Sequence, residues 1–456
     1  MNAAGRFAAH VCGTHFEDLS AEAIDRAKTF ILDSLGVGIA GSSVEHGTAL
    51  CDIAAQWGNR AEARVWGRKI RLAPAAAAFV NAWQMHNQEF DCLHEGAVVH
   101  AMASVLPAAL AIADTRDDVT GKDLIVAVAV GCDIAATLGR AARGGMRFFR
   151  PGTAGGFGGV AAAARLLHLD EAPLQRAFAF QLAQASGTMQ AHLEGSPILP
   201  MQVALNARAA LTSCELATLD LTPPREIFEG SFGYLQVFES AWELDPLLTD
   251  LGRRWRIAEF SHKPYPAGRA THGGIEGVTA LCAQAGFHPG TGSERIESVR
   301  INAPPLIVRL VGRPDLPAPD PSYARLCMAY VVAKVLQHGA LDPRHFRGDA
   351  LTDPTTHALA AKVHIEPDDN PDPNALAPQA VTLRLTDGRA LTWCCSTMRA
   401  SPSRPLDRAA HLDKFRICWQ FAGETLPADN AERLMNLADR LERLADVRDL
   451  TRLLAA

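Results

Sequence analysis

Apolar residues recur at helical spacing through roughly the first 250 residues of the chain. These segments are rich in alanine, which favours helix and permits close contact between helices. Ser20 precedes the first segment as an N-cap, and the small apolar run between Gly36 and Gly41 suits tight helix packing. We see no alternation of strands with these helices, which argues against a doubly wound nucleotide-binding fold. The predicted helices cover residues 23–35, 75–83, 101–113, 124–142, 160–167, 171–185 and 203–219.

The pattern changes after about Arg256, where apolar and polar residues begin to alternate with period two, as in half-buried strands. The dipeptide Asp387-Gly388 lies between two such segments and predicts a hairpin turn. Helical spacing also occurs in this half, and it returns in the strongly amphipathic tail. The predicted strands cover residues 296–301, 362–365, 381–385 and 390–394, and the predicted helices cover 273–285, 322–338 and parts of 409–454.

These elements predict a mostly α protein with a smaller α+β domain. A large all-helical domain would consist of residues 1–258 and 402–456, discontinuous because the amphipathic tail can pack back on the first helices. Residues 259–401 would form an α+β lid domain. A chain of 456 residues is long enough for two or three domains.

Composition narrows the class of protein. The formal net charge of −6 and a pI near 6.2 argue against a nucleic-acid partner, which requires a basic surface. The N-terminus lacks a signal peptide, and no segment has about 18 uninterrupted apolar residues, so we expect a cytoplasmic protein without a membrane span. The ten cysteines form no CxxC pair, which indicates reduced thiols rather than a zinc site.

Two polar segments interrupt the apolar sequence. The first places six titratable residues within fifteen positions: His86, Glu89, Asp91, His94, Glu95 and His100. The second surrounds two prolines and contains His262, Lys263, Tyr265 and Arg269. Burying many titratable groups carries a desolvation cost, and groups whose pKa values shift through burial serve acid/base catalysis. The two segments together predict an active site that handles carboxylates.

Each candidate also has a structural interpretation. His94 and His100 are six residues apart and do not share a helix face, and no zinc-type spacing is present, so a metal site is the weaker interpretation. We interpret His86 as a packing residue rather than a catalytic one. Lys263 precedes a proline and is held extended, so it is either a fixed inward cation or a solvated lysine in a linker.

The glycine-rich run of residues 152–159 does not match a dinucleotide or phosphate-binding motif, so close packing or a flexible loop explains it better. As an alternative, free N–H groups at the start of the following helix could bind an anion, together with Arg147 and Arg150. The chain contains no GxSxG motif, which argues against a serine hydrolase. The only argument for a nucleophilic role of Cys92 is its proximity to histidines in the sequence.

Several segments in the right order resemble the MmgE/PrpD family over most of the chain. They are HNQEFDCLHEGAVVHAMASVLPAALA, LDSLGVGIAGS, KPYPAGRATHGGIEG, SYARLCMAYVVA and GVAAAARLLHLD. The family includes 2-methylcitrate dehydratases, cis-aconitate decarboxylases and iminodisuccinate epimerases. The resemblance implies a large helical domain, a smaller α+β lid, a homodimer, and an active site in the cleft between the domains. It also implies that neither a metal nor an organic cofactor takes part.

The resemblance assigns roles to individual residues. His100 falls on the catalytic histidine of the family, Lys263 on the lysine of its KPYP-type motif, and Tyr330 on its helical tyrosine. Arg325 falls on the basic position before that tyrosine, and Asp91 on the second acidic position of the D-F-D-D run.

The chain also departs from the family pattern. Glu89 replaces the first acidic residue of that run, Cys92 the last, and Leu93 the threonine that follows. Arg150 stands where a histidine normally precedes the glycine-rich segment. Residues 197–203 replace the T-K-x-x-H segment and contain neither lysine nor histidine. A changed substrate, a changed reaction or a loss of activity would each account for these departures.

We therefore predict a cofactor-independent, dehydratase-type lyase that acts on a small di- or tricarboxylic acid. His100 would be the general acid/base, with Glu89 and Asp91 fixing its tautomer or serving as a second base. Tyr330 would donate a proton or orient the substrate. The expected substrate contacts are Lys263, Arg150, His94, Arg325 and Arg269. Epimerisation of a dicarboxylate such as iminodisuccinate, or carboxylate binding without catalysis, are the alternatives.

Overall fold

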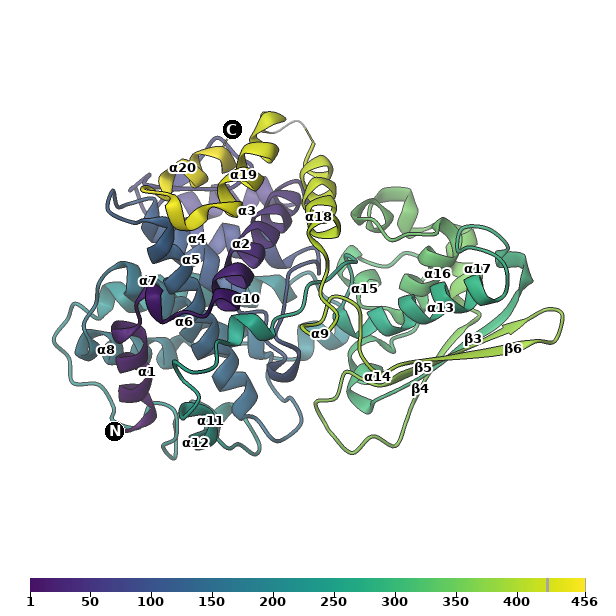
Figure 1. Cartoon of the computed structure of the whole chain (residues 1–456), viewed down its shortest axis with the longest axis horizontal. Helices are drawn as coiled ribbons and strands as arrows, with labels where there is room; N and C mark the ends of the chain where they lie inside the picture. The colour runs from purple at the N-terminus through teal and green to yellow at the C-terminus, as the bar shows by residue number, and fades with distance from the viewer. Residues whose placement is uncertain (424–425, 456) are drawn as a thin grey trace.

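A computed structural model describes residues 1–423 and 426–455. The chain forms a larger helical part and a smaller α+β part that lie side by side (Figure 1). The predicted fold class, mostly α with a smaller α+β domain, is confirmed. The helices of the larger part are α1 (Ala3–Gly13), α2 (Ala21–Ser42), α3 (Gly47–Ala55), α4 (Pro74–His86), α5 (Met102–Ala113), α6 (Gly121–Ala141), α7 (Ala154–Leu166), α8 (Glu171–Gln184), α9 (Gln190–Glu194), α10 (Leu199–Leu216), α11 (Tyr234–Phe238) and α12 (Asp245–Leu248).

Helix α6 lies at the centre of this part and packs against α7, α5 and α2. By length and composition it could cross a membrane, but 94% of its most apolar stretch is buried inside the protein. Gly131 of α6 and Gly158 of α7 face each other so closely that a methyl group on either would meet the backbone carbonyl of the other. Small residues therefore set the distance between these two core helices.

This packing also explains the glycine-rich run. Most of it belongs to the first turns of α7, so the interpretation as close packing is correct and the interpretation as a loop is wrong. The alternative anion site at this helix start is also not formed, because Arg150 is paired with a carboxylate and Arg147 is exposed.

The α+β part contains one four-stranded sheet in the order β4-β3-β5-β6. β3 pairs in parallel with β4 and antiparallel with β5, and the predicted hairpin joins β5 to β6 through Gly388, which has φ +89°. α13 and α16 contact the sheet on the face seen above it in Figure 1, and α14 contacts β4. The strands are β3 (Ile296–Ala303), β4 (Val363–Pro367), β5 (Gln379–Leu385) and β6 (Ala390–Cys395), and the helices are α13 (His272–Gln284), α14 (Pro305–Val311), α15 (Pro321–Arg325), α16 (Met328–His338) and α17 (Pro354–Ala360).

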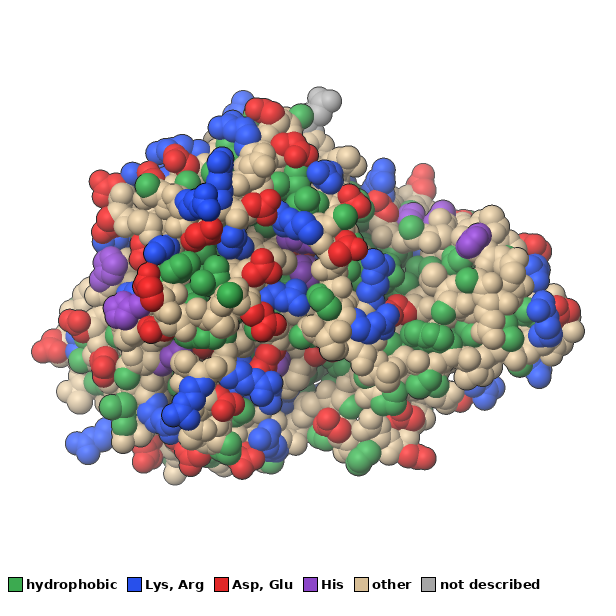
Figure 2. Space-filling model, in the orientation of Figure 1, with side chains coloured by type: hydrophobic (Ala, Val, Ile, Leu, Met, Phe, Trp, Pro, Cys, Tyr) green, Lys and Arg blue, Asp and Glu red, His purple; other side chains and the backbone are tan. Residues whose placement is uncertain are grey.

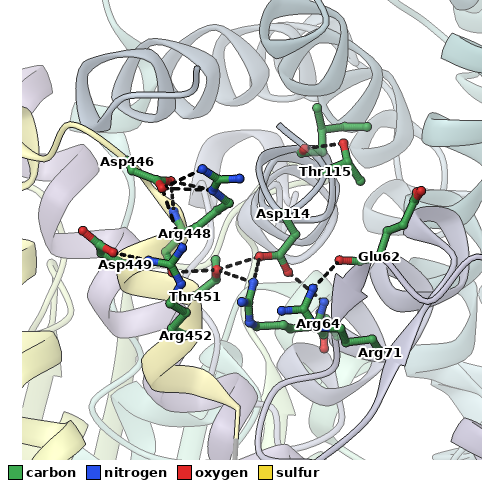
Figure 3. A network of polar contacts seen from close by, with 12 residues as sticks. Glu62, Arg64, Arg71, Asp114, Thr115, Asp446, Arg448, Asp449, Thr451 and Arg452 are labelled. Atoms are coloured by element: carbon green, nitrogen blue, oxygen red, sulfur yellow. Dashed lines mark hydrogen bonds and ion pairs between the residues drawn. The ribbon is translucent and has the colours of Figure 1, made fainter. Parts of the chain in front are cut away.

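The C-terminal tail returns to the helical part, as its amphipathic pattern suggested. Its helices are α18 (Arg408–Phe421), α19 (Asp429–Asp439) and α20 (Arg448–Thr451), and α18 and α19 pack on α2. Lys414 of α18 lies 2.7 Å from the buried carboxylate of Asp33 in α2. Further along, the Thr451 hydroxyl donates to Asp114 at 2.6 Å, and Arg64 pairs with the same carboxylate (Figure 3).

Local details differ from the predictions. Two two-residue strands, β1 (Ala63–Arg64) and β2 (Arg71–Leu72), pair within the helical part, where no strand was predicted. The helix predicted over residues 322–338 is interrupted at Leu326 and Cys327, so it forms α15 and α16. Strands of two residues are too short to produce a period-two pattern, which is why the sequence gives no sign of them.

Positive and negative side chains are interspersed over the face shown in Figure 2, with scattered apolar residues between them. No large field of one sign covers this face, which agrees with the modest net charge of −6.

The contact between α2 and α4 can be tested at Gly41. A methyl group on Gly41 would overlap the backbone carbonyl of Gln84 in α4, and backbone atoms of a packed helix cannot move away. We expect Gly41→Ala to lower the free energy of unfolding by about 1–3 kcal/mol, as overpacking does. Gly13→Ala is the control, because Gly13 is helical and a methyl group there meets nothing within 4 Å. Urea denaturation followed by circular dichroism measures both, and equal stabilities would contradict the packing described.

Candidate active site

Two segments far apart in the chain are joined at the site by a short stretch of backbone pairing. The Leu93 N–H donates to the Ser261 carbonyl at 3.1 Å, and the Ser261 N–H donates to the Leu93 carbonyl at 2.8 Å. Asp91 precedes Leu93 by two residues, and Lys263 follows Ser261 by two residues. The bridge therefore places the two polar segments of the sequence side by side.

Asp91 is the centre of a buried cluster of titratable groups. Its Oδ2 accepts hydrogen bonds from Nδ1 of both His86 and His100, each at 2.9 Å. The Lys263 ammonium lies 3.6 Å from the other oxygen of Asp91 and donates to Glu89 at 2.8 Å. Asp91 and Lys263 are completely buried. The structure thus brings together four predicted site residues, Glu89, Asp91, His100 and Lys263, and adds His86 to them.

The end of helix α4 aims these side chains at one another. α4 ends at His86, and Glu89 then takes a left-handed backbone conformation with φ +49°. A left-handed conformation costs a non-glycine residue roughly 1 kcal/mol or more, so it persists only where other contacts hold it. Lys263 holds the side chain of Glu89, and Lys414 of α18 donates to the carbonyl of Phe90 at 2.8 Å. The C-terminal tail thereby helps to position the turn between α4 and Asp91.

The cations of the cluster keep both carboxylates ionised. Burial pushes the pKa of Glu89 upward, but the charges of Lys263 and the two histidines outweigh burial and lower it to about 2. Burial likewise opposes ionisation of Asp91, yet His100, His86 and Lys263 hold its pKa well below the usual range. At neutral pH the site therefore contains two carboxylates and one ammonium in close contact.

The two histidines share one carboxylate oxygen, but their pKa values shift in opposite directions. For His86, the attraction of Asp91 and Glu89 outweighs burial and raises the pKa. For His100, burial prevails over the attraction of Asp91, and the Lys263 charge adds to it, so the pKa is lowered. His100 is then neutral at pH 7, with its proton on Nδ1, because that nitrogen donates to an ionised carboxylate. This leaves a lone pair on Nε2, as a general base requires.

His100 borders a cavity between the helical and the α+β parts, and its empty space of about 540 Å³ includes space open to solvent. The polar residues of its lining are His86, Glu89, His100, His192 and Arg269. The other lining residues are Leu93, Val98, Met146, Phe149, Pro151, Gly268, Ala270, Leu310, Val311, Leu326 and Leu376.

His192 of α9 is a site residue that the sequence did not reveal. It is 7% exposed, and its Nδ1 is buried without a hydrogen-bond partner among the described residues. Burial and the neighbouring Arg313 guanidinium lower the pKa of His192 to about 4, so it is neutral at pH 7. The family resemblance implies a histidine within residues 197–203, and a single histidine outside that segment belongs to no motif. His86, interpreted as a packing residue, also lines the cavity.

Arg269 is the predicted substrate contact that does line the cavity. Its Nε donates to Glu95 at 2.8 Å, and its Nη1 donates to the Arg399 carbonyl at 2.8 Å. Arg269 is only 3% exposed. It is thus a fixed cation in the wall of the cavity, partly neutralised by Glu95.

Arg150 and His94 are not placed as predicted. Arg150 is buried, and its guanidinium donates to both carboxylate oxygens of Glu239, at 2.8 and 3.1 Å, which leaves it unavailable as a substrate clamp. His94 uses both ring nitrogens within the protein. Its Nε2 donates to Glu259 at 2.7 Å, and its Nδ1 accepts from the Ala97 N–H at 3.1 Å. Neither residue lines the cavity.

Tyr330 and Arg325 also lie outside the cavity lining. The buried Tyr330 hydroxyl donates to the carbonyls of His345 and Ala350, at 3.0 and 2.8 Å, so the predicted proton transfer is not supported. Arg325 donates to Gln88 at 2.8 Å, one residue from Glu89 and behind the cavity wall. A buried polar group requires a partner, and both side chains find one within the protein.

The same groups can be assessed as metal ligands. Ligand atoms of His86, Asp91 and His100 lie within 4.8 Å of one another, but both imidazoles already donate to the carboxylate, and an ammonium adjoins it. A second group, Asp33, His262 and His411, has the same spacing, and Lys414 lies 2.7 Å from its carboxylate. Positive charge beside each carboxylate favours hydrogen bonding over cation binding.

Cys92 is buried and its pKa is raised well above the usual range, so it is not an activated nucleophile.

Comparison with known proteins identifies two family models along the chain. Residues 5–247 match the MmgE/PrpD N-terminal domain, and residues 265–443 match the MmgE/PrpD C-terminal domain. The resemblance inferred from short motifs is thereby confirmed over most of the sequence.

Curated relatives cover nearly the whole chain. It is 28% identical to "Cis-aconitate decarboxylase" of Mus musculus, with 98% of this chain and 92% of the relative aligned. The corresponding protein of Homo sapiens is 27% identical, over 98% of this chain and 93% of the relative. "Cis-aconitate decarboxylase-like protein oryM" of Aspergillus oryzae is 25% identical, over 96% and 94%.

The buried ion pair at the centre of the site makes a prediction for stability. In Lys263→Met the carboxylates of Glu89 and Asp91 would be left buried without their cation. Breaking a buried pair in this way typically costs about 3–5 kcal/mol, and we expect the free energy of unfolding to fall by that amount. The double variant Lys263→Met/Glu89→Gln, which removes one of the orphaned charges, should recover part of the loss.

Chemical denaturation of the three proteins measures these differences. Lys69→Met is the matched control, because Lys69 is exposed and surface substitutions usually change stability by less than about 0.5 kcal/mol. A Lys263→Met protein as stable as the Lys69→Met control would mean that the ammonium does not neutralise the cluster.

Proposed function

The chain belongs to the MmgE/PrpD family, and we propose that it is a lyase acting on a small di- or tricarboxylic acid by proton transfer next to a carboxylate. Dehydration is the form of this reaction that the site supports best. The observation that carries the proposal is His100, oriented by Asp91 and neutral at pH 7, on the wall of a cavity between the two parts of the chain. The proposal involves no metal or organic cofactor.

In the proposed dehydration, Nε2 of His100 removes a proton from the carbon next to a substrate carboxylate. The electron pair of the broken C–H bond moves toward that carboxylate, where Arg269 can stabilise the growing negative charge. The bond from the neighbouring carbon to its hydroxyl then breaks, and a C=C bond forms. The hydroxyl takes the proton from Nε2 and leaves as water. Asp91 stabilises the transient imidazolium by accepting from its Nδ1–H.

Lys263 has a different part in this proposal from the one predicted. Its ammonium faces Glu89 and Asp91 rather than a substrate carboxylate, and it keeps both carboxylates ionised. It is therefore a positioning residue, acting through Asp91 on the tautomer of His100.

Decarboxylation is the second candidate, because the similar proteins of Mus musculus and Homo sapiens are cis-aconitate decarboxylases. In that reaction the bond to the departing CO2 breaks first, and the carbon that keeps the electron pair takes a proton. His100 would have to be protonated beforehand, whereas dehydration begins with the neutral ring.

Epimerisation draws support from His192 of α9, which gives the cavity a second neutral imidazole. Carboxylate binding without catalysis draws support only from the residues that depart from the family pattern. The homodimer and the cytoplasmic location stay predictions.

Turnover can be measured by proton NMR in deuterated water with 2-methylcitrate, citrate, cis-aconitate and iminodisuccinate. We expect loss of water from a hydroxy acid, seen as new alkene signals. General acid/base catalysis supplies about 10²–10⁴-fold, so His100→Asn should slow turnover by at least ~100-fold. His364→Asn, an exposed strand residue, is the control and should not change the rate. Deuterium incorporation without alkene indicates epimerisation, and no reaction with any acid contradicts the enzyme proposal for this panel.

The pH dependence of kcat/KM separates dehydration from decarboxylation. The pKa of His100 is lowered from 6.5, so the neutral base predominates at pH 7 and is lost as the pH falls through that lowered pKa. For dehydration we expect kcat/KM to be constant near pH 7 and to fall on acidification. A rate that instead rises on acidification identifies His100 as an acid and favours decarboxylation. His100→Asn should remove this ionisation from the profile.

A further inference from the structure

The cations at the cavity already have partners within the protein. Arg269 is paired with Glu95, and the Lys263 ammonium lies between Glu89 and Asp91 without lining the cavity. Among the described lining residues, Arg269 is the only lysine or arginine. The lining also contains one carboxylate, that of Glu89. A ligand with three carboxylates would therefore bring far more negative charge than this wall compensates.

One side of the cavity is apolar and is built from both parts of the chain. Met146 and Phe149 come from the segment between α6 and α7, and Leu310 and Val311 come from α14. All four are buried to at least nine-tenths.

Leu326 and Leu376 extend this wall from two further segments of the α+β part. A carboxylate placed against these six side chains would lose its water without gaining a hydrogen bond. An alkyl group placed there would be removed from water, which is favourable.

We propose that the substrate carries an alkyl arm of several carbons where a tricarboxylic acid has its third carboxylate. One carboxylate lies near Arg269 and His100, and the arm packs against Met146, Phe149, Leu310 and Leu376. This inference rests on the proposed function for the identity of the reacting unit. The preference for an alkyl arm is a statement about binding, so it can be tested separately from turnover.

Three acids with the same reacting unit provide the test: malate, 3-butylmalate and isocitrate, which carry hydrogen, butyl and carboxymethyl on the same carbon. Isothermal titration with the wild-type protein measures binding, and His100→Asn gives the same measurement without turnover. We expect 3-butylmalate to bind at least about tenfold tighter than isocitrate and tighter than malate, because each buried methylene favours binding. Where turnover occurs, kcat/KM should follow the same order.

A charge introduced into the wall should reverse this order. Leu376→Arg adds a cation to the cavity, and we expect isocitrate to gain affinity relative to 3-butylmalate by about tenfold or more. Leu316→Arg is the matched control, because Leu316 is exposed and does not line the cavity, so the order should stay that of the wild type. Leu310→Gln, an uncharged polar substitution, should weaken binding of 3-butylmalate alone and serves if Leu376→Arg does not fold.

The outcomes distinguish the two proposals. Tighter binding of 3-butylmalate without turnover of any acid supports the alkyl arm and contradicts the lyase. Turnover of isocitrate with affinity equal to or greater than that of 3-butylmalate supports the lyase and overturns the alkyl arm. Failure of all three acids to bind overturns the alkyl arm as well.

Discussion

The site depends on the neutralisation of a buried ammonium. Lys263 is completely buried, and a charge in that position is tolerated only beside opposite charge. Glu89 at 2.8 Å and Asp91 at 3.6 Å provide it, and they stand on a segment some 170 residues earlier in the chain. The Leu93–Ser261 bridge and the left-handed conformation of Glu89 belong to the same arrangement. The ion pair therefore fixes how the two parts of the molecule meet.

The same cluster decides which histidine is available for chemistry. One carboxylate oxygen of Asp91 accepts a hydrogen bond from both imidazoles. His86 also lies near the Glu89 carboxylate, and this second negative charge favours the protonated form of His86. His100 stays neutral and turns Nε2 away from the carboxylate. Neither part of the chain contains the site alone, since the helical part supplies His100 and His192 and the α+β part supplies Arg269 and much of the apolar wall.

The departures from the family pattern and the shape of the cavity point in the same direction. Residues 197–203 lack the lysine and histidine of the family segment, and Arg150 is bound to Glu239 rather than turned toward a ligand. Arg269 is then the only lysine or arginine among the described residues that line the cavity. Buried apolar side chains make up one wall of the cavity. These changes agree with a family reaction retained on a less charged substrate.

Hydrophobic periodicity predicted most of the long helices and the change of architecture after Arg256, and the Asp387-Gly388 turn predicted the hairpin, because each depends on local sequence alone. The two polar segments within apolar sequence also contain the residues that meet in the buried cluster around Asp91. Only the tertiary structure shows that His100 and Arg269 line the cavity whereas His94 and Arg150 do not. It also places His192 in the cavity wall. Periodicity specifies which face of an element is buried, whereas the role of a buried polar side chain depends on its partner. Those partners, Glu259 for His94 and Glu239 for Arg150, come from distant segments that only the fold brings near.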